Sequence, residues 1–246
     1  MPREAGPLDC PHPAAMRFFF LSPLLLLCLL LSHCASHPPA ETLPQKSTVI
    51  VVHGIFASEV TMRPLRNALT AQGIATLSPS LRPSDGSAGL DELAAQLRDY
   101  IDARLPERAP IQIVAHSMGG LISHYYLEEL GGKDRCRAFY TMASPHHGTP
   151  FAKIHPGPAG RQMEPGSSFT KKLLNIVRPA YPVTCYRSST DLVILPSESA
   201  TLPYADNVLI RSPGHIYLTK DRDLTRDLTA RIKAIDERAL SAARSF

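Results

Sequence analysis

The sequence has no block of lysine and arginine residues and no basic strip interleaved with aromatic side chains. Its 26 basic residues are nearly balanced by 22 acidic ones, which leaves a formal net charge of +4. Proteins that bind nucleic acid usually gather positive charge along one face. We therefore expect no nucleic acid among the partners of this protein.

Internal repeats are also absent, and outside the N-terminus there is no long low-complexity segment. A solenoid or propeller would show self-similarity at a period of roughly 20 to 50 residues. The 246 residues are 44% hydrophobic and 20% charged, which is ordinary for a globular protein. The sequence therefore predicts a single domain with a substantial core.

Cysteine is scarce, and three of the five cysteines precede residue 35. Only Cys136 and Cys185 remain in the rest of the chain. In an oxidising compartment such a pair can form a disulfide. The alternative is two buried thiols on neighbouring strands, where the geometry for a bridge is restrictive. The sequence leaves both interpretations open.

The sequence has only one long hydrophobic run. It is an uncharged stretch of 14 residues at 18–31 that follows Arg17 and contains Pro23. A helix that crosses roughly 30 Å of hydrocarbon needs about 20 apolar residues, so the run has the length of a signal-peptide core. We therefore expect export. Translation from Met16 would give a compact positive start, and both Met1 and Met16 remain candidate initiators.

The residues that end at Cys34 resemble the lipobox of bacterial lipoproteins, in which the cysteine is lipidated. His33 departs from that pattern, because the position usually holds Gly, Ala or Ser. Cleavage near Ser36 or Ala40 and an uncleaved anchor are the alternatives. We expect residues 1–40 to be a signal segment with a short linker, and the protein to be periplasmic, membrane-anchored or secreted.

Residues 41–246 alternate between apolar strands and amphipathic helices, which predicts an α/β fold with a mostly parallel sheet flanked by helices. The first apolar segment is continuous rather than alternating, as in a strand that is buried on both faces. Expected strands are 48–54, 74–78, 111–116, 138–143, 182–186 and 208–210, and expected helices are 59–72, 90–104, 121–130 and 223–244.

Ser117 lies between the apolar strand at 111–116 and a helical segment. A serine on such a turn is held in a strained backbone conformation, which requires small residues two positions before and after it. These residues are Ala115 and Gly119, so the pattern is that of a nucleophile elbow with alanine in place of the first glycine. An ordinary strand-to-helix turn is the alternative.

A serine nucleophile needs a general base, and His215 is the only late histidine. It lies on a Ser-Pro-Gly loop before the last helix, where a base is expected. His116 is interpreted as a structural neighbour, because its side chain must point away from that of Ser117. The pair His146 and His147 has no carboxylate or cysteine at ligand spacing, so we expect loop hydrogen bonds there rather than a metal site.

The base needs a carboxylate to orient it, and the chain offers several between Ser117 and His215. Asp191 is preferred, because it follows a strand-like run and precedes an apolar segment that would bury it. Asp206 is its chief rival, although an aspartate before a strand commonly forms a turn. The candidates include Asp134, Glu164, Asp191, Glu198 and Asp206.

The negative oxygen that forms on attack needs hydrogen-bond donors. Two backbone N–H groups are suitably placed: that of Met118, directly after the serine, and that of Ile55, directly after His53-Gly54. Glycine at position 54 lets the chain turn sharply there.

The order Ser117, Asp191, His215, with His53-Gly54 upstream and the Ser-Pro-His-His-Gly-Thr segment at 144–149, resembles the α/β-hydrolase superfamily. Within it, the bacterial lipases and esterases are most similar, and the likeness covers residues 47–235. The resemblance implies a minimal α/β-hydrolase fold and hydrolysis of carboxylic esters, such as acylglycerols, without metal or organic cofactor. An acyltransferase or thioesterase with the same triad, and a non-catalytic binding protein, are the alternatives.

The segment 151–181 lies between two expected core strands, where enzymes of this kind carry a lid. Its apolar face either meets an acyl chain or packs on the domain. The candidate substrate contacts are Phe56, Phe151, Met163 and Leu173.

Overall fold

A six-stranded sheet forms the centre of the computed structural model, which describes residues 45–244. All neighbouring strands are parallel, in the order β2-β1-β3-β4-β5-β6. The predicted parallel α/β architecture is therefore confirmed. The strands are β1 (Thr48–Val52), β2 (Thr76–Leu77), β3 (Ile111–His116), β4 (Cys136–Met142), β5 (Val183–Ser188) and β6 (Asp206–Ile210).

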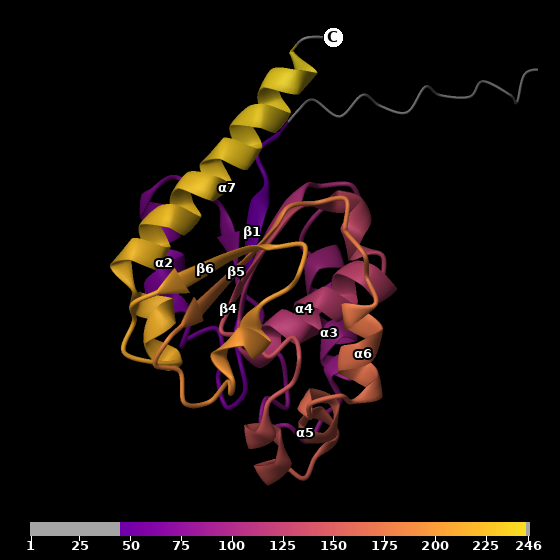
Figure 1. The fold of residues 1–246 in the computed structure, drawn as a ribbon. Coiled ribbons are helices and arrows are strands. Elements are labelled where there is room, and N and C mark those ends of the chain that lie inside the picture. The colour runs from indigo at the N-terminus through magenta and orange to yellow at the C-terminus, as the bar shows by residue number, and fades with distance from the viewer. Residues whose placement is uncertain (1–44, 245–246) are drawn as a thin grey trace, which may run out of the picture. The chain divides into compact units, whose positions relative to one another are not determined.

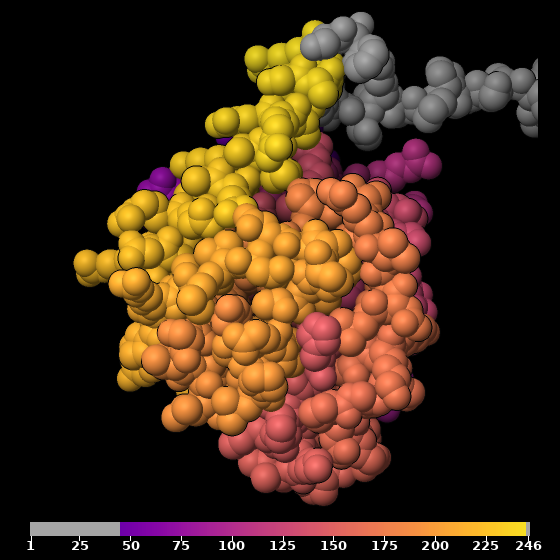
Figure 2. All heavy atoms as spheres, in the orientation of Figure 1, coloured from indigo at the N-terminus to yellow at the C-terminus, as the bar shows by residue number. Residues whose placement is uncertain are grey.

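Helices cover both faces of this sheet (Figure 1). Helices α2 and α7 lie on one face, and α3, α4 and α6 lie on the other. Their bounds are α2 (Arg63–Ala71), α3 (Leu90–Asp102), α4 (Met118–Glu129), α5 (Pro158–Met163), α6 (Ser168–Leu174) and α7 (Arg222–Ala243). The space-filling view in the same orientation shows α7, in yellow, extending beyond the body of the domain (Figure 2).

Strand β1 is apolar at four consecutive positions, Val49 to Val52, because both of its faces are covered. Ile50 and Val52 belong to the core layer under α3 and α4, whereas Val49 and Val51 belong to the layer under α2 and α7. All four side chains are fully buried. A parallel sheet covered on both faces requires this pattern.

The sheet has its topological switch point between β1 and β3, because the chain adds β2 on one side of β1 and then β3 on the other. In open α/β sheets, ligands bind at the carboxyl ends of the strands that flank this point. The turn after β1 and the residue after β3 therefore lie side by side at the edge where a site is expected.

Two helices begin at positions that differ from the sequence-based expectation. Helix α2 begins at Arg63 rather than residue 59, because Pro64 occupies its first turn and lacks the N–H that an interior position needs. Helix α4 begins at Met118 rather than Leu121. The glycines at its start have low helix propensity, but close packing requires them there.

Cys136 and Cys185 are free thiols. The strand register pairs Cys185 with Thr141, five positions along β4 from Cys136. At about 3.3 Å per residue, the two cysteines lie roughly 16 Å apart, far beyond the reach of a disulfide. The disulfide interpretation is therefore wrong.

The insert between β4 and β5 packs on the domain. Helix α5 contacts α3, and α6 contacts α4. The side chain of Gln162 accepts a hydrogen bond from Leu90 N and donates one to Asp91. Gly157 lies so close to Gly86 that an added Cβ would collide with its carbonyl oxygen. These contacts fasten the insert to the loop before α3.

The expectations for the signal segment, the start site and lipidation of Cys34 concern residues outside the described range. Within residues 45–244, no helix is both long enough and apolar enough to cross a membrane.

Candidate active site

The backbone at the carboxyl ends of three neighbouring strands is strained. Ser117, which follows β3, has φ 54° and ψ −128°; Phe56 after β1 and Ala143 after β4 also have positive φ. Positive φ is unfavourable for residues with a Cβ, and it persists only where the surrounding structure enforces it. The strain gathers at the edge of the sheet that the topology marks as the site.

Tight packing explains the small residues around Ser117. An added Cβ at Gly119 would collide with the carbonyl oxygen of His53, and one at Gly120 would collide with Ser144 Oγ. Ala115 is fully buried within β3, where its methyl group is accommodated. The alanine in place of the first glycine is therefore compatible with the elbow.

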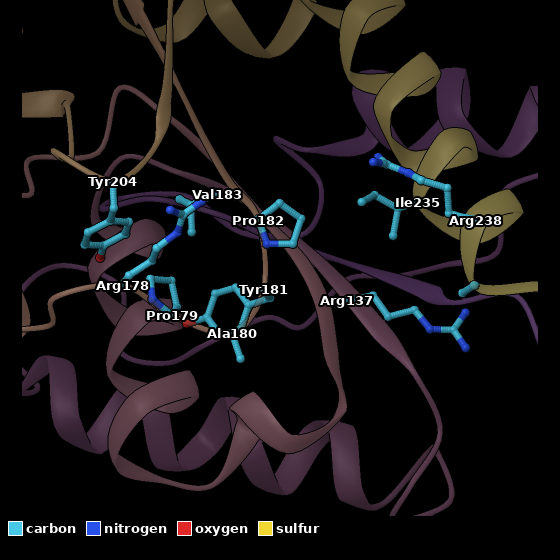
Figure 3. A pocket seen from close by; sticks show the side chains of 11 residues that line it. Arg137, Arg178, Pro179, Ala180, Tyr181, Pro182, Val183, Tyr204, Ile235 and Arg238 are labelled. Atoms are coloured by element: carbon cyan, nitrogen blue, oxygen red, sulfur yellow. The ribbon is translucent and has the colours of Figure 1, made fainter. Parts of the chain in front are cut away.

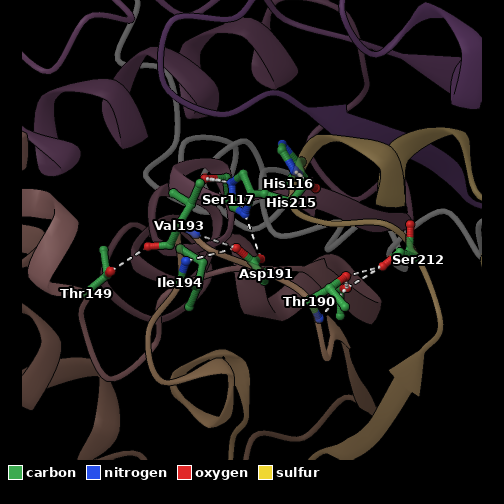
Figure 4. Close-up of polar contacts among 10 residues, drawn as sticks. His116, Ser117, Thr149, Thr190, Asp191, Val193, Ile194, Ser212 and His215 are labelled. Atoms are coloured by element: carbon green, nitrogen blue, oxygen red, sulfur yellow. Dashed lines mark hydrogen bonds and ion pairs between the residues drawn. The ribbon is translucent and has the colours of Figure 1, made fainter.

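Ser117, His215 and Asp191 form one hydrogen-bonded chain (Figure 4). The distance between Ser117 Oγ and His215 Nε2 is 2.9 Å, and that between His215 Nδ1 and Asp191 Oδ2 is 2.8 Å. An ionised carboxylate only accepts hydrogen bonds, so Nδ1 carries the proton and Nε2 accepts from the serine hydroxyl. The three residues thus have the arrangement that nucleophile, base and orienting acid require.

Asp191 is held in its ionised form. Burial opposes ionisation, but the hydrogen bond and charge of His215 and the N–H groups of Ile194 and Val193 outweigh it, so the pKa of Asp191 is lowered. Asp191 Oδ1 accepts from these two N–H groups at 3.0 and 2.8 Å. The carboxylate is therefore fixed in position as well as charged.

The loop that carries His215 is anchored from two sides. Ser188 and Thr190, at the end of β5, both donate to the carbonyl oxygen of Ser212 at 2.7 Å. His116 Nε2 donates to the carbonyl oxygen of His215 at 3.1 Å. Burial and the nearby His215 lower the pKa of His116 to about 3, so this ring stays neutral. The His116 ring also lies beside that of His215, with 4.8 Å between the ring centroids, so His116 is a structural neighbour of the site.

The turn after β1 lies beside the elbow, because Val52 pairs with Ala115. Buried His53 fixes this turn. Its Nε2 accepts from Leu81 N at 2.9 Å, so Nδ1 carries the proton and donates to Gly54 O, also at 2.9 Å. In a trans peptide group the N–H points opposite to the C=O. The bond to Gly54 O therefore turns the N–H of Ile55 outward from the core.

Two backbone donors remain available at the site. Within residues 45–244, neither Ile55 N–H nor Met118 N–H donates to another atom. Met118 is the first residue of α4, so its N–H belongs to the unpaired group at a helix N-terminus. The sequence predicts both N–H groups as oxyanion donors, and that role stays a prediction. The role of His53 was missed, and the His-Gly pair was the available signal for it.

The rival carboxylates have other partners. Asp206 forms an ion pair with Arg231 at 2.6 Å, and Glu198 forms one with Arg187 at 3.0 Å.

Of the two neighbouring histidines His146 and His147, the first is buried, and His146 Nε2 lies 3.1 Å from Thr141 Oγ1 inside the core. The described part of the chain contains no group of three or more His, Cys, Asp or Glu residues that could hold a metal ion.

The four predicted substrate contacts divide into two pairs. Phe56 and Phe151 are 67% and 45% exposed, and both rings contact His155. Met163 and Leu173 are 4% and 1% exposed and belong to the core, so their assignment as substrate contacts is wrong. The helical spacing identified an apolar face correctly, but α3 and α4 cover that face.

Several exposed apolar side chains lie in segments that follow the carboxyl ends of the strands. They lie in the turn after β1, the start of the insert, and the loops that carry Asp191 and His215. These residues are Phe56, Val60, Phe151, Ile154, Leu192, Leu195, Ile216 and Tyr217, which we call the apolar rim. Such a patch on a folded protein commonly marks a binding surface.

Comparison with known proteins finds related sequences. A family model described as the alpha/beta hydrolase fold matches residues 47–159. The human lysosomal thioesterase PPT2 is 30% identical over 142 residues, which are 55% of this chain and 44% of that protein. The matched part of the chain therefore spans less than half the length of this relative.

Solved structures share the same architecture. Aspergillus fumigatus lipase B superposes with a TM-score of 0.61 and 16% identity, covering 71% of this chain and 49% of that one. The mature Bacillus licheniformis lipase BlEst2 superposes with a TM-score of 0.59 and 18% identity, covering 79% and 95%. At such identities the likeness shows the fold alone. Together with the family match over residues 47–159, it shows that this chain has the α/β-hydrolase fold.

Proposed function

We propose that this protein is a serine hydrolase that cleaves carboxylic esters through an acyl-enzyme on Ser117. One observation carries the proposal: the chain of hydrogen bonds from Ser117 Oγ through His215 to Asp191, at 2.9 and 2.8 Å. A serine hydroxyl is a weak nucleophile unless a neighbouring base removes its proton. In this proposal His215 is that base, and the Asp191 carboxylate stabilises its protonated form.

The reaction proceeds in two steps, formation of the acyl-enzyme and its hydrolysis. Ser117 Oγ attacks the ester carbonyl carbon while His215 Nε2 takes the hydroxyl proton, and the carbonyl oxygen becomes an oxyanion that accepts from the N–H groups of Ile55 and Met118. Collapse of this intermediate expels the alcohol, which takes the proton from His215. Water then attacks the acyl-enzyme by the same route and releases the carboxylic acid.

The apolar rim supports esters with apolar acyl groups as substrates. Its side chains lie in the loops that also carry the triad and the oxyanion donors. An acyl chain that extends from the reacting carbonyl carbon would therefore contact apolar surface. Lipase or esterase activity on acylglycerols or similar lipid esters is the activity that fits best.

Thioester hydrolysis is the second candidate, and the similarity to the lysosomal thioesterase PPT2 favours it. A thioester differs in its leaving group, which departs as a thiol instead of an alcohol. Nucleophilic attack, the oxyanion and the acyl-enzyme are the same in both reactions. Preference for an ester or a thioester therefore depends on which substrate the surface beside Ser117 binds.

We also propose that the protein is exported and attached to a membrane. The apolar run at 18–31 and the lipobox-like residues that end at Cys34 support this location.

Hydrolysis of nitrophenyl esters and acyl thioesters of rising chain length tests the proposal. Changing Ser117→Ala removes the nucleophile, and kcat should fall by about four orders of magnitude or more. The matched control is Ser123→Ala on α4, the helix that follows Ser117, since Ser123 Oγ is buried and has no hydrogen-bond partner within residues 45–244. Undiminished activity in the Ser117 variant would overturn the mechanism, and the preferred substrate series would separate esterase from thioesterase.

A further inference from the structure

The amino ends of the strands form the edge of the sheet opposite the candidate active site. Strand β1 runs from Thr48 at this amino edge to Val52 next to the site. The described chain also begins here, because Asp236 on α7 accepts hydrogen bonds from Ser47 N and Ser47 Oγ. The amino edge is therefore where the preceding part of the chain joins the domain.

A hollow of about 510 Å³ opens at this edge. Three arginines from three separate elements line it: Arg137 on β4, Arg178 in the segment before β5, and Arg238 on α7 (Figure 3). Its remaining walls are mainly prolines, tyrosines and aliphatic side chains, and no carboxylate is among the lining residues. The hollow combines positive charge with apolar surface.

Two of these guanidinium groups are largely free within the described part of the chain. Arg178 is exposed and makes no hydrogen bond or ion pair there. Arg238 is exposed and uses only its Nε, which donates to Ala234 O at 3.1 Å. The guanidinium group of Arg137 already has partners within the domain: it donates a hydrogen bond to Gln45 O at 2.7 Å and lies 3.4 Å from an oxygen of Asp236. Arg137 thus ties the hollow to the start of the domain.

The arrangement of the arginines indicates the kind of partner. Figure 3 shows Arg178 on one side of the hollow and Arg238 on the other, rather than converging on one point. A single small anion is bound best by donors that converge on it. Separated cations beside apolar and tyrosine surface fit a plane that presents many negative groups, such as a bilayer with anionic lipids.

We propose that the amino edge docks on an anionic lipid bilayer, with Arg178 and Arg238 contacting headgroup phosphates. The apolar run ends at residue 31, and residues 32–44 span at most about 45 Å before the domain begins. A run held in a bilayer would keep the arginines close to its surface at high effective concentration. Docking in this way turns the apolar rim and Ser117 away from that bilayer.

Vesicle binding by the full chain tests the proposal, with vesicles of phosphatidylcholine alone and vesicles that also contain phosphatidylglycerol. The hydrophobic N-terminus contributes to both, so the measured quantity is the ratio of the two affinities. The unmodified chain should prefer anionic vesicles at low salt and lose the preference at high salt. The double variant Arg178→Ser/Arg238→Ser should lower the ratio by about 25-fold, since each arginine near such a surface contributes about fivefold.

The matched control is Arg63→Ser/Arg222→Ser, which removes two exposed arginines at the starts of α2 and α7, on the carboxyl edge. It should leave the ratio unchanged. An equal ratio for the double variant and the unmodified chain, or no preference for anionic vesicles at all, overturns the proposal. Loss of the preference in inorganic phosphate at constant ionic strength would assign a small-anion site instead. Binding is measured independently of catalysis, so Ser117→Ala should behave as the unmodified chain.

Discussion

At the level of single residues, the turn after β1 depends on the ring of His53. Burial lowers the pKa of this ring, so it remains neutral and keeps one nitrogen as acceptor and the other as donor. It thereby joins Leu81 N to Gly54 O and sets the direction of the next peptide group. A residue outside the Ser117, His215 and Asp191 chain thus sets the direction of the Ile55 N–H, the oxyanion donor that we propose.

Changing His53→Ala should lower kcat for ester hydrolysis by about 10- to 100-fold with little change in KM. The reason is that a misdirected Ile55 N–H stabilises the oxyanion less, whereas ground-state binding does not depend on it. Steady-state kinetics on a soluble ester measures the change.

His147→Ala serves as the control, since this exposed histidine makes no side-chain hydrogen bond within residues 45–244. A His53 variant that raised KM and left kcat intact would contradict the positioning role. Circular dichroism would report whether the variant still folds.

Much of the residue-level arrangement was predictable from the order of Ser117, Asp191 and His215, because each follows a strand and parallel strands end at one edge. The role of His53 was not predictable, because it depends on an amide 28 positions away. The prediction that Met163 and Leu173 contact the substrate was wrong for a related reason. The spacing of apolar residues shows which face of a helix is apolar, but not which element covers that face.

At the level of elements, the last helix is fastened to the sheet through Asp236. This nearly buried carboxylate accepts from Ser47 N, Ser47 Oγ and Gln112 Nε2 at 3.0, 2.6 and 3.2 Å. Gln112 also donates to Ile232 O and accepts from Tyr140 OH. Helix α7 is thus joined to β3, β4 and the segment before β1 by one polar network.

Changing Asp236→Ala should lower the free energy of unfolding by about 2 to 4 kcal/mol, because it leaves several buried donors without an acceptor. Urea denaturation followed by circular dichroism measures the loss. Glu237→Ala is the control, since its exposed neighbouring side chain makes no such bonds. Equal stability of the two variants would show that the network contributes little.

The bounds of the elements were predictable where the sequence alone sets them, as for β3 at Ile111–His116. They were not predictable at the start of α4. Propensity disfavours Gly119 and Gly120 in a helix, but contact with His53 and Ser144 leaves no room for a side chain. Tertiary packing, which a single sequence does not reveal, decides that boundary.

At the level of the whole molecule, four buried histidines with lowered pKa values, His53 and three others, make the fold sensitive to acid. Burial lowers the pKa of His124 to about 4, that of His146 well below its ordinary value, and that of His116 to about 3. In the unfolded chain the pKa of each of these rings is about 6.5. Between the unfolded and folded pKa values, the unfolded chain binds more protons, so stability falls as the pH falls.

We predict that the free energy of unfolding decreases by several kcal/mol between pH 7 and about pH 4, with His124 contributing about 3 kcal/mol. Urea denaturation at a series of pH values measures the slope. His124→Asn should flatten it, because asparagine does not titrate in this range. A slope that is the same with and without His124 would show that this ring does not drive the acid sensitivity.

The contact between Ser47 and Asp236 brings the beginning of the described chain to the helix that ends it, at the amino edge. A resin, an electrode or a fused protein attached next to residue 45 or next to the end of α7 would therefore lie on the same side of the domain. The face with Ser117 and the apolar rim would stay open to the surrounding solution. The fold thus predicts that the domain, residues 45–244, tolerates immobilisation through either of its own ends.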